Sequence, residues 1–332
     1  MNDKSHTLQK TQRDILRYAA NLIGAAAAIY ILVTTLFRLL LGWLFTAFNK
    51  SATLANPVSV PDIAVALGNL LLTGIGLVCA IWFLSRSATA SLRPRLHFTD
   101  PKDVRLWLFL PVFLGIGILC SVLTAGLQSW LAQHTAYTVP EGTRLPNGVL
   151  PMLLAFLTLC VAPAILEEIL CRGWMQGMLR RWGVWFSVIV SSAVFALLHG
   201  DIAQMPSILI LSVCLGLAAY ATDSLLPSVL LHFCNNTVAF IMLCTRQKLS
   251  GTAQLGASLY FVFIVFAVTA AAVALIIRWR LLSTLRPVPV HHNPENRQKR
   301  VLRMATAPVY VVVMLWLVLR AVWPLFPLGK GA

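Results

Sequence analysis

Apolar residues run in long segments along this chain, separated by short polar stretches that hold most of its Lys and Arg. A helix needs about 20 apolar residues to cross the hydrocarbon core of a bilayer. By that length the sequence predicts an all-α, polytopic membrane bundle of about nine spans, eight plus an extra C-terminal one, with the fifth and sixth short. The predicted spans are 18–41, 62–84, 106–131, 149–171, 184–199, 207–221, 226–244, 256–277 and 306–325.

The composition agrees with this pattern. Of the 332 residues, 58% are hydrophobic and 11% are charged, and the mean hydropathy is +0.80. These values exclude an ordinary soluble domain. The seven cysteines show no CxxC spacing and lie mostly inside apolar segments, so we expect buried hydrophobic thiols and neither disulfides nor a thiolate metal site.

The net charge of +15 is spread over the segments between spans and lacks the aromatic interleaving of a nucleic-acid site, so no nucleic-acid partner is expected. Basic residues instead orient the spans, because cytoplasmic loops are enriched in Lys and Arg. The richest basic segments are 1–17, 85–105, 180–181 and 278–305. Strict alternation then predicts a multi-pass protein of the cell membrane, with a cytoplasmic amino terminus and the carboxyl terminus on the opposite side.

Three parts follow from this pattern. Residues 1–148 are expected to form N-terminal transmembrane helices, residues 149–245 a polar-containing core, and residues 246–332 C-terminal helices joined by the basic linker 278–305. The adjacent His291 and His292 lie in that linker and are expected to be solvated loop residues, not metal ligands.

An ionisable side chain inside a membrane span costs free energy and usually has a function. The segment "PAILEEILCRG" holds three charged residues. Glu168 precedes Arg172 by four residues, the spacing and order that favour an ion pair along one helix. Glu167 points about 100° away around the helix, which leaves its carboxylate available as a base. Pro163 is expected to kink this helix.

Two further motifs place polar side chains in spans. "FALLH" puts Phe195 and His199 on one helix face, and "HFCNN" does the same for His232 and Asn236. Each alone has an ordinary explanation, as a helix cap or as an interhelical hydrogen bond. Together they suggest that these side chains lie close to one another. In an antiparallel helical hairpin that turns at Gly183, Glu167 lies sixteen residues before the turn and His199 sixteen after it, so the two would be level. A carboxylate, two imidazoles and a carboxamide would supply a base and oxyanion donors.

If both helical turns lie at the membrane surface, Glu167 and His199 would lie at a different depth in the bilayer from His232. Glu167 and His199 are about 24 Å from a turn at Gly183, whereas His232 is about 8 Å from a turn at Pro227. The conflict disappears if "RGWMQGMLRRWG" extends the hairpin beyond the bilayer. The fifth span would then stop short, with "GDIAQMPS" as a buried re-entrant turn.

These three motifs, read as EExxxR, FxxxH and HxxxN, resemble those of the CPBP family of intramembrane endopeptidases (CAAX protease and bacteriocin-processing, or Abi, family). The resemblance covers about residues 150–245 and implies a membrane-embedded protease. It implies that Glu167 and His199 activate water while His232 and Asn236 bind the oxyanion. Glu168, Arg172 and Phe195 would support the site.

Three questions stay open at this point. A carboxylate and two histidines, Glu167, His199 and His232, could bind zinc in principle, although metal-free hydrolysis is favoured and no other cofactor is expected. The substrate is also open, because both peptides and lipidated proteins in the bilayer are compatible with such a protease. The same buried polar residues could also serve a non-catalytic transporter or an immunity-type interaction protein.

Overall fold

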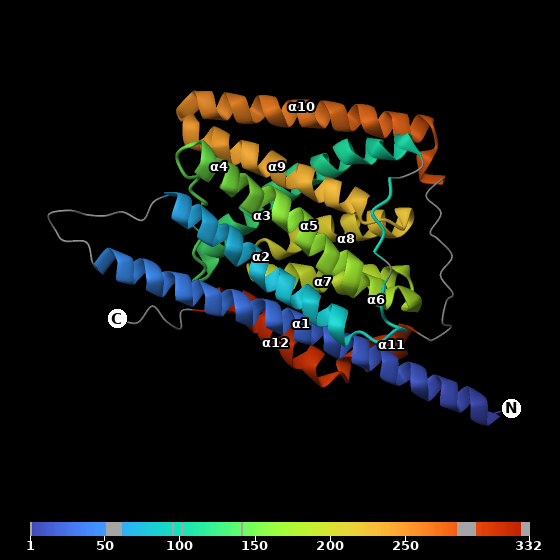
Figure 1. Ribbon diagram of the computed structural model, residues 1–332. Helices are drawn as coiled ribbons and strands as arrows, with labels where there is room; N and C mark the ends of the chain where they lie inside the picture. Colours follow the sequence, from blue (N-terminus) through green and yellow to red (C-terminus); the bar gives the residue numbers. More distant parts are fainter. Residues whose placement is uncertain are drawn as a thin grey trace.

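The computed structural model describes residues 2–50, 62–94, 96–100, 103–140, 142–283 and 297–326. Within these ranges all regular secondary structure is helical (Figure 1). The elements are α1 (Asn2–Lys50), α2 (Asp62–Ser87), η1 (Val104–Leu108), α3 (Phe109–His134), α4 (Val149–Phe156), η2 (Leu157–Val161), α5 (Ala162–Glu168), η3 (Ile169–Gln176), α6 (Gly177–Leu179), η4 (Arg180–Trp182), α7 (Val184–His199), α8 (Met205–Thr222), α9 (Leu226–Lys248), α10 (Gly251–Arg278), η5 (Leu281–Ser283), α11 (Arg297–Ala305), α12 (Pro308–Val322) and η6 (Trp323–Leu325).

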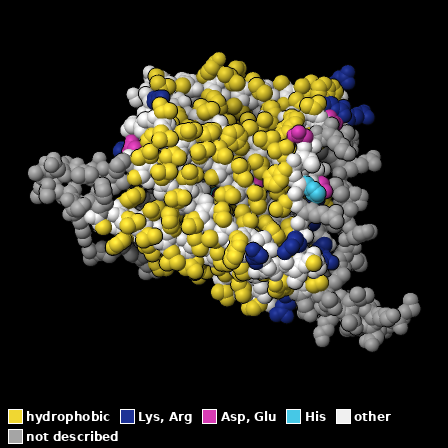
Figure 2. Space-filling model, viewed as in Figure 1, with side chains coloured by type: hydrophobic (Ala, Val, Ile, Leu, Met, Phe, Trp, Pro, Cys, Tyr) yellow, Lys and Arg dark blue, Asp and Glu magenta, His cyan; other side chains and the backbone are white. Residues whose placement is uncertain are grey.

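Among the described residues, eight helical segments are long and apolar enough to cross a membrane, and Val184–His199 is a shorter apolar helix. This confirms the predicted polytopic all-α bundle and its short fifth span. Large hydrophobic side chains remain exposed on most helices, and they cover most of the face in Figure 2. Apolar surface of that extent marks an interaction surface, here the lipid of the bilayer. The chain is a multi-pass membrane protein.

The helices pack as a layered bundle with α10 along one edge and α1 with α12 along the other (Figure 1). The main buried core joins α1, α2, η3, α6, α7 and α12. The backbones of α1 and α12 approach closely, since a Cβ added to Gly24 would come within 2.7 Å of Tyr310 Cα. Asn21 Oδ1 also accepts a hydrogen bond from the Val309 N–H at 3.1 Å, which caps the start of α12.

The predicted basic segments meet at one end of the bundle. The Arg17 guanidinium donates to the Thr306 carbonyl at 3.2 Å, and Arg181 donates to the carbonyl of Ser91 at 3.3 Å. Arg300 donates to the Trp182 carbonyl. Residues 284–296 of the linker, which include His291 and His292, lie outside the described residues.

At the far end of α7 the chain turns back before α8 begins at Met205. Asp201 holds this turn, because its carboxylate accepts from the Ala203 N–H at 2.9 Å and from the Tyr137 hydroxyl at 3.0 Å. Ala203 is fully buried. With sixteen residues, α7 is about 24 Å long, less than a bilayer core of about 30 Å. The helix is thus short, as predicted, whereas the re-entrant position of "GDIAQMPS" in the bilayer stays a prediction.

Candidate active site

The two glutamates lie on a continuous helical segment, Val149–Trp182. Two parts of it, η2 and η3, are π-helical, and α5 lies between them. η2 ends at Val161, and Pro163 is the second residue of α5. Proline lacks a backbone N–H and clashes with the carbonyl four residues earlier, so a widened turn relieves the strain. The predicted irregularity near Pro163 is thus present as a π turn, and Glu167 and Glu168 end the α-helical segment that follows it.

Glu168 and Arg172 form the predicted ion pair. Arg172 Nη1 lies 2.6 Å from Glu168 Oε1, and the residues are 3% and 0% exposed. The other terminal nitrogen, Nη2, donates to the carbonyl and hydroxyl oxygens of Ser212 at 3.1 and 2.8 Å. The guanidinium also lies over the ring of Phe195, 4.7 Å from its centroid. Arg172 therefore joins α5, α7 and α8 while it neutralises Glu168.

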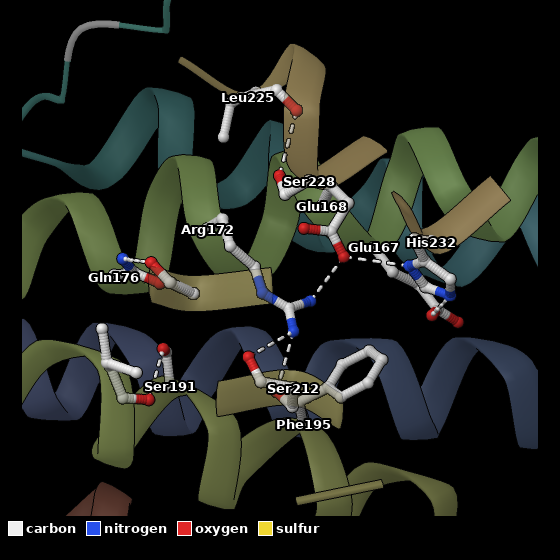
Figure 3. A network of polar contacts seen from close by, with 12 residues as sticks. Glu167, Glu168, Arg172, Gln176, Ser191, Phe195, Ser212, Leu225, Ser228 and His232 are labelled. Carbon is white, nitrogen blue, oxygen red and sulfur yellow. Dashed lines mark hydrogen bonds and ion pairs between the residues drawn. The ribbon is translucent and has the colours of Figure 1, made fainter. Parts of the chain in front are cut away.

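His232 lies next to both carboxylates (Figure 3). Its Nδ1 is 2.9 Å from Glu168 Oε1, and its Nε2 is 3.8 Å from Glu167 Oε2. A carboxylate can only accept, so Nδ1 carries the proton and donates to Glu168. This bond fixes the ring and directs Nε2 toward Glu167. Glu168 therefore has a partner that the helix spacing alone did not reveal.

Phe195 connects the two histidines. Its ring meets those of His199 and His232 edge-on, with centroids 4.7 and 6.2 Å away. His199 is exposed at the end of α7, and its Nδ1 lies 2.9 Å from the Phe195 carbonyl oxygen. Since a carbonyl can only accept, Nδ1 donates, and in neutral His199 the lone pair is on Nε2.

The structure brings the predicted residues together unequally. Among the described residues, His232 comes within the 4.0 Å ion-pair distance of Glu167, and His199, which the residue count had placed level with it, does not. Asn236 is half-buried one helical turn beyond His232 and makes no hydrogen bond to a described residue. The contact between His232 and Glu168 also removes the conflict in height, because the helix continues well beyond the site to Trp182.

Two charged or polar residues near the site were not singled out in the sequence. The Tyr30 hydroxyl of α1 interacts electrostatically with both Glu167 and Arg320. Arg320 of α12 packs against Gly200, the residue after His199, because a Cβ added to Gly200 would lie 2.8 Å from its Cζ. A single arginine inside the apolar span 306–325 was a visible signal, but no motif linked it to the site.

The sequence also left a metal site open for Glu167, His199 and His232. Within the described part of the chain, no three His, Cys, Asp or Glu side chains are grouped closely enough to hold a metal ion. Because His232 Nδ1 is bound to Glu168, only its Nε2 could bind a metal, and the other two side chains are not grouped with it as ligands in the described structure.

Comparison with known proteins adds one finding. Residues 149–238 match the family described as type II CAAX prenyl endopeptidase Rce1-like. The match confirms the family resemblance over this segment, which contains all of the motif residues. No curated protein and no solved structure matches the chain. The matched family is a protease family, whereas α1 to α3 and α10 to α12 lie outside the matched residues.

Proposed function

We propose that this protein is an intramembrane endopeptidase that hydrolyses peptide bonds of membrane-embedded or lipidated substrates with water activated by Glu167 and His199. The observation that carries the proposal is the buried cluster in which Glu168 holds both Arg172 and His232 while His232 Nε2 is directed toward Glu167. Arg172 and His232 engage Glu168, and Glu167 keeps a partly exposed carboxylate, with 17% of its side chain accessible. The family match supports the reaction class.

Glu167 serves as the general base in this proposal. It takes a proton from a water held in front of it, and the hydroxide attacks the peptide carbonyl carbon. His199 can assist, because its Nδ1–H is bound to the Phe195 carbonyl and its Nε2 is therefore a free acceptor. The proton then passes to the leaving amine, so the base is restored after each turnover.

His232 has the opposite role, as an oxyanion donor. Glu167 and Glu168 carry two negative charges and Arg172 one positive charge, so an imidazolium at His232 brings the buried cluster to zero net charge. Both ring nitrogens of an imidazolium donate: Nδ1 to Glu168 and Nε2 into the space beside Glu167, where the oxyanion forms. Asn236, one turn further along α9, adds a carboxamide donor.

We propose metal-free hydrolysis, because the chain's own groups supply the base and the donors. The rival function is a non-catalytic transporter or interaction protein in which the same residues relay protons or fix helices. The paired donors beside a partly exposed carboxylate favour hydrolysis, since a relay does not require an oxyanion site.

The test is cleavage by purified protein in lipid nanodiscs. The probes are a prenylated peptide that ends in a CAAX sequence and a panel of membrane-spanning peptides, with fragments identified by mass spectrometry. We expect wild type to cleave at least one probe, and turnover to be unchanged by EDTA or 1,10-phenanthroline. Failure to cleave any probe would favour the non-catalytic reading, and loss of turnover with chelator, restored by zinc, would overturn the metal-free mechanism.

A further inference from the structure

A row of polar side chains runs from the candidate site to one end of the bundle. Glu168, Arg172, Gln176 and Arg180 follow one another at four-residue intervals, and the last three contact α8 or the residue after it. Arg172 donates to Ser212, Gln176 Nε2 donates to the Gly216 carbonyl at 2.8 Å, and Arg180 pairs with Asp223 at 2.5 Å. The Arg180 and Asp223 side chains are 25% and 46% exposed. The row therefore connects the buried cluster to the molecular surface.

A cavity of about 200 Å³ lies along this row. Its walls include Arg172, Gly177 and Arg180 on one side, with Ala219, Asp223 and Leu225 on the other. Polar and apolar atoms share its lining about equally, whereas the larger cavity of about 470 Å³ that Ala218 lines on the neighbouring face of α8 is mostly apolar. Each water occupies about 30 Å³ in the liquid, so several waters fit in the smaller cavity.

Three buried polar atoms of this row lack a hydrogen-bond partner among the described residues: Glu168 Oε2, Arg172 Nε and Gln176 Oε1. In Figure 3 the unbonded oxygen of Glu168 points away from His232. The neighbouring Ser228 hydroxyl donates to the Leu225 carbonyl at 3.0 Å and also lies within reach of the Glu168 carboxylate. An unpartnered buried polar atom is costly, so these atoms indicate a partner that the protein does not supply.

The chemistry of the three atoms identifies that partner. Arg172 Nε can only donate, whereas Glu168 Oε2 and Gln176 Oε1 accept. An anion would satisfy Arg172 but repel Glu168, and a cation would do the reverse. Only a species that both donates and accepts satisfies all three, and water is the species that buried polar sites of this size hold.

We propose that this cavity is a hydrated passage that carries water from the end of the bundle at Arg180 and Asp223 to Arg172, the residue that holds Glu168. The claim that the passage serves catalysis rests on the proposed function, because hydrolysis inside an apolar bundle consumes water. The claim that the cavity holds water does not rest on the proposed function. A measurement of hydration therefore tests the passage separately from peptide cleavage.

The first test measures aqueous access at two adjacent positions of α8. Ala219→Cys places a thiol in the proposed passage, and Ala218→Cys places one in the apolar cavity. Protein in nanodiscs is treated with 2-sulfonatoethyl methanethiosulfonate, and the modified residue is located by mass spectrometry, with native Cys214 of the apolar cavity as internal control. We expect Cys at 219 to react at least 10-fold faster than Cys at 218. Equal rates would overturn the passage, whether or not the protein cleaves peptides.

The second test asks whether filling the cavity raises or lowers the unfolding temperature. It requires no reagent to enter the cavity. Ala219→Leu fills the cavity. Filling a dry cavity stabilises a protein, whereas displacing water from Arg172 and Glu168 strands their polar atoms. We expect the unfolding temperature to fall by several degrees and peptide turnover to drop at least 10-fold, with little change in Ala218→Leu. A higher unfolding temperature for Ala219→Leu would show a dry cavity, and stabilisation of wild type by inorganic phosphate would show an anion site; either overturns the proposal.

Discussion

At the scale of single residues, the candidate site depends on how one buried carboxylate is shared. Glu168 Oε1 accepts from Arg172 Nη1 at 2.6 Å and from His232 Nδ1 at 2.9 Å. The first contact links residues four apart on one helix, so the sequence predicted it. The second crosses between helices and depends on how α5 and α9 pack, which no local spacing encodes. The contacts of Ser212, Tyr30 and Arg320 escaped prediction for the same reason.

Removing the arginine should strand a buried charge. Breaking a buried ion pair from one side costs about 3–5 kcal/mol, so we expect Arg172→Ala to lower both the yield of folded protein and its unfolding temperature in detergent. Arg105→Ala is the matched control, because it removes the arginine of an exposed pair with Asp103, in which the arginine side chain is 48% exposed. Equal unfolding temperatures for the two variants would show that the Glu168–Arg172 pair does not hold the fold.

At the scale of helices, the hydrophobic pattern was sufficient for the order of the apolar helices, eight of which, among the described residues, are long enough to cross a membrane, whereas the predicted fifth span, α7, is shorter. The pattern could not give the π-helical turns η2 and η3, because a change of hydrogen-bond register leaves the apolar pattern almost unaltered. Nor could it show that α1 and α12, about 280 residues apart, lie against each other. Their contact depends on Gly24, which no motif marked.

The approach of α1 to α12 gives a direct test of packing. A Cβ at Gly24 would lie 2.7 and 2.9 Å from the backbone Cα and N of Tyr310, so the helices must move apart. Overpacking of this kind costs about 1–3 kcal/mol, and we expect Gly24→Ala to unfold at a lower temperature than wild type. Gly42→Ala, also on α1, meets no atom within 4 Å. Its helix propensity should leave stability unchanged or raise it by up to about 1 kcal/mol. A Gly24→Ala protein as stable as Gly42→Ala would contradict the packing of α12 on α1.

At the scale of the whole molecule, the basic segments define one end of the bundle. Arg17 reaches Thr306, Arg181 reaches Ser91 and Arg300 reaches Trp182, so segments far apart in sequence gather there. The sequence predicted this gathering from the Lys and Arg count alone. Because cytoplasmic loops are enriched in these residues, we propose that this end faces the cytoplasm.

Cysteine labelling tests that orientation. In sealed cells, a membrane-impermeant maleimide should leave His292→Cys unlabelled until the membrane is opened, whereas Ala332→Cys should react in intact cells. Native cysteines are distinguished by peptide mass spectrometry. Protection of both positions would place the carboxyl terminus in the cytoplasm and would remove one crossing from the nine-span arrangement.

The central claim, that Glu167 provides the base while Glu168 holds the site together, is tested most directly by comparing Glu167→Gln with Glu168→Gln. Both substitutions keep size and remove one carboxylate, on adjacent residues of α5. The measurement is peptide turnover in nanodiscs together with thermal unfolding of the same samples. We expect Glu167→Gln to fold like wild type and to lose at least about 100-fold in turnover, the lower end of general-base contributions. Glu168→Gln should lose more stability and less of the chemistry. A well-folded Glu167→Gln protein with turnover near that of wild type would contradict the account.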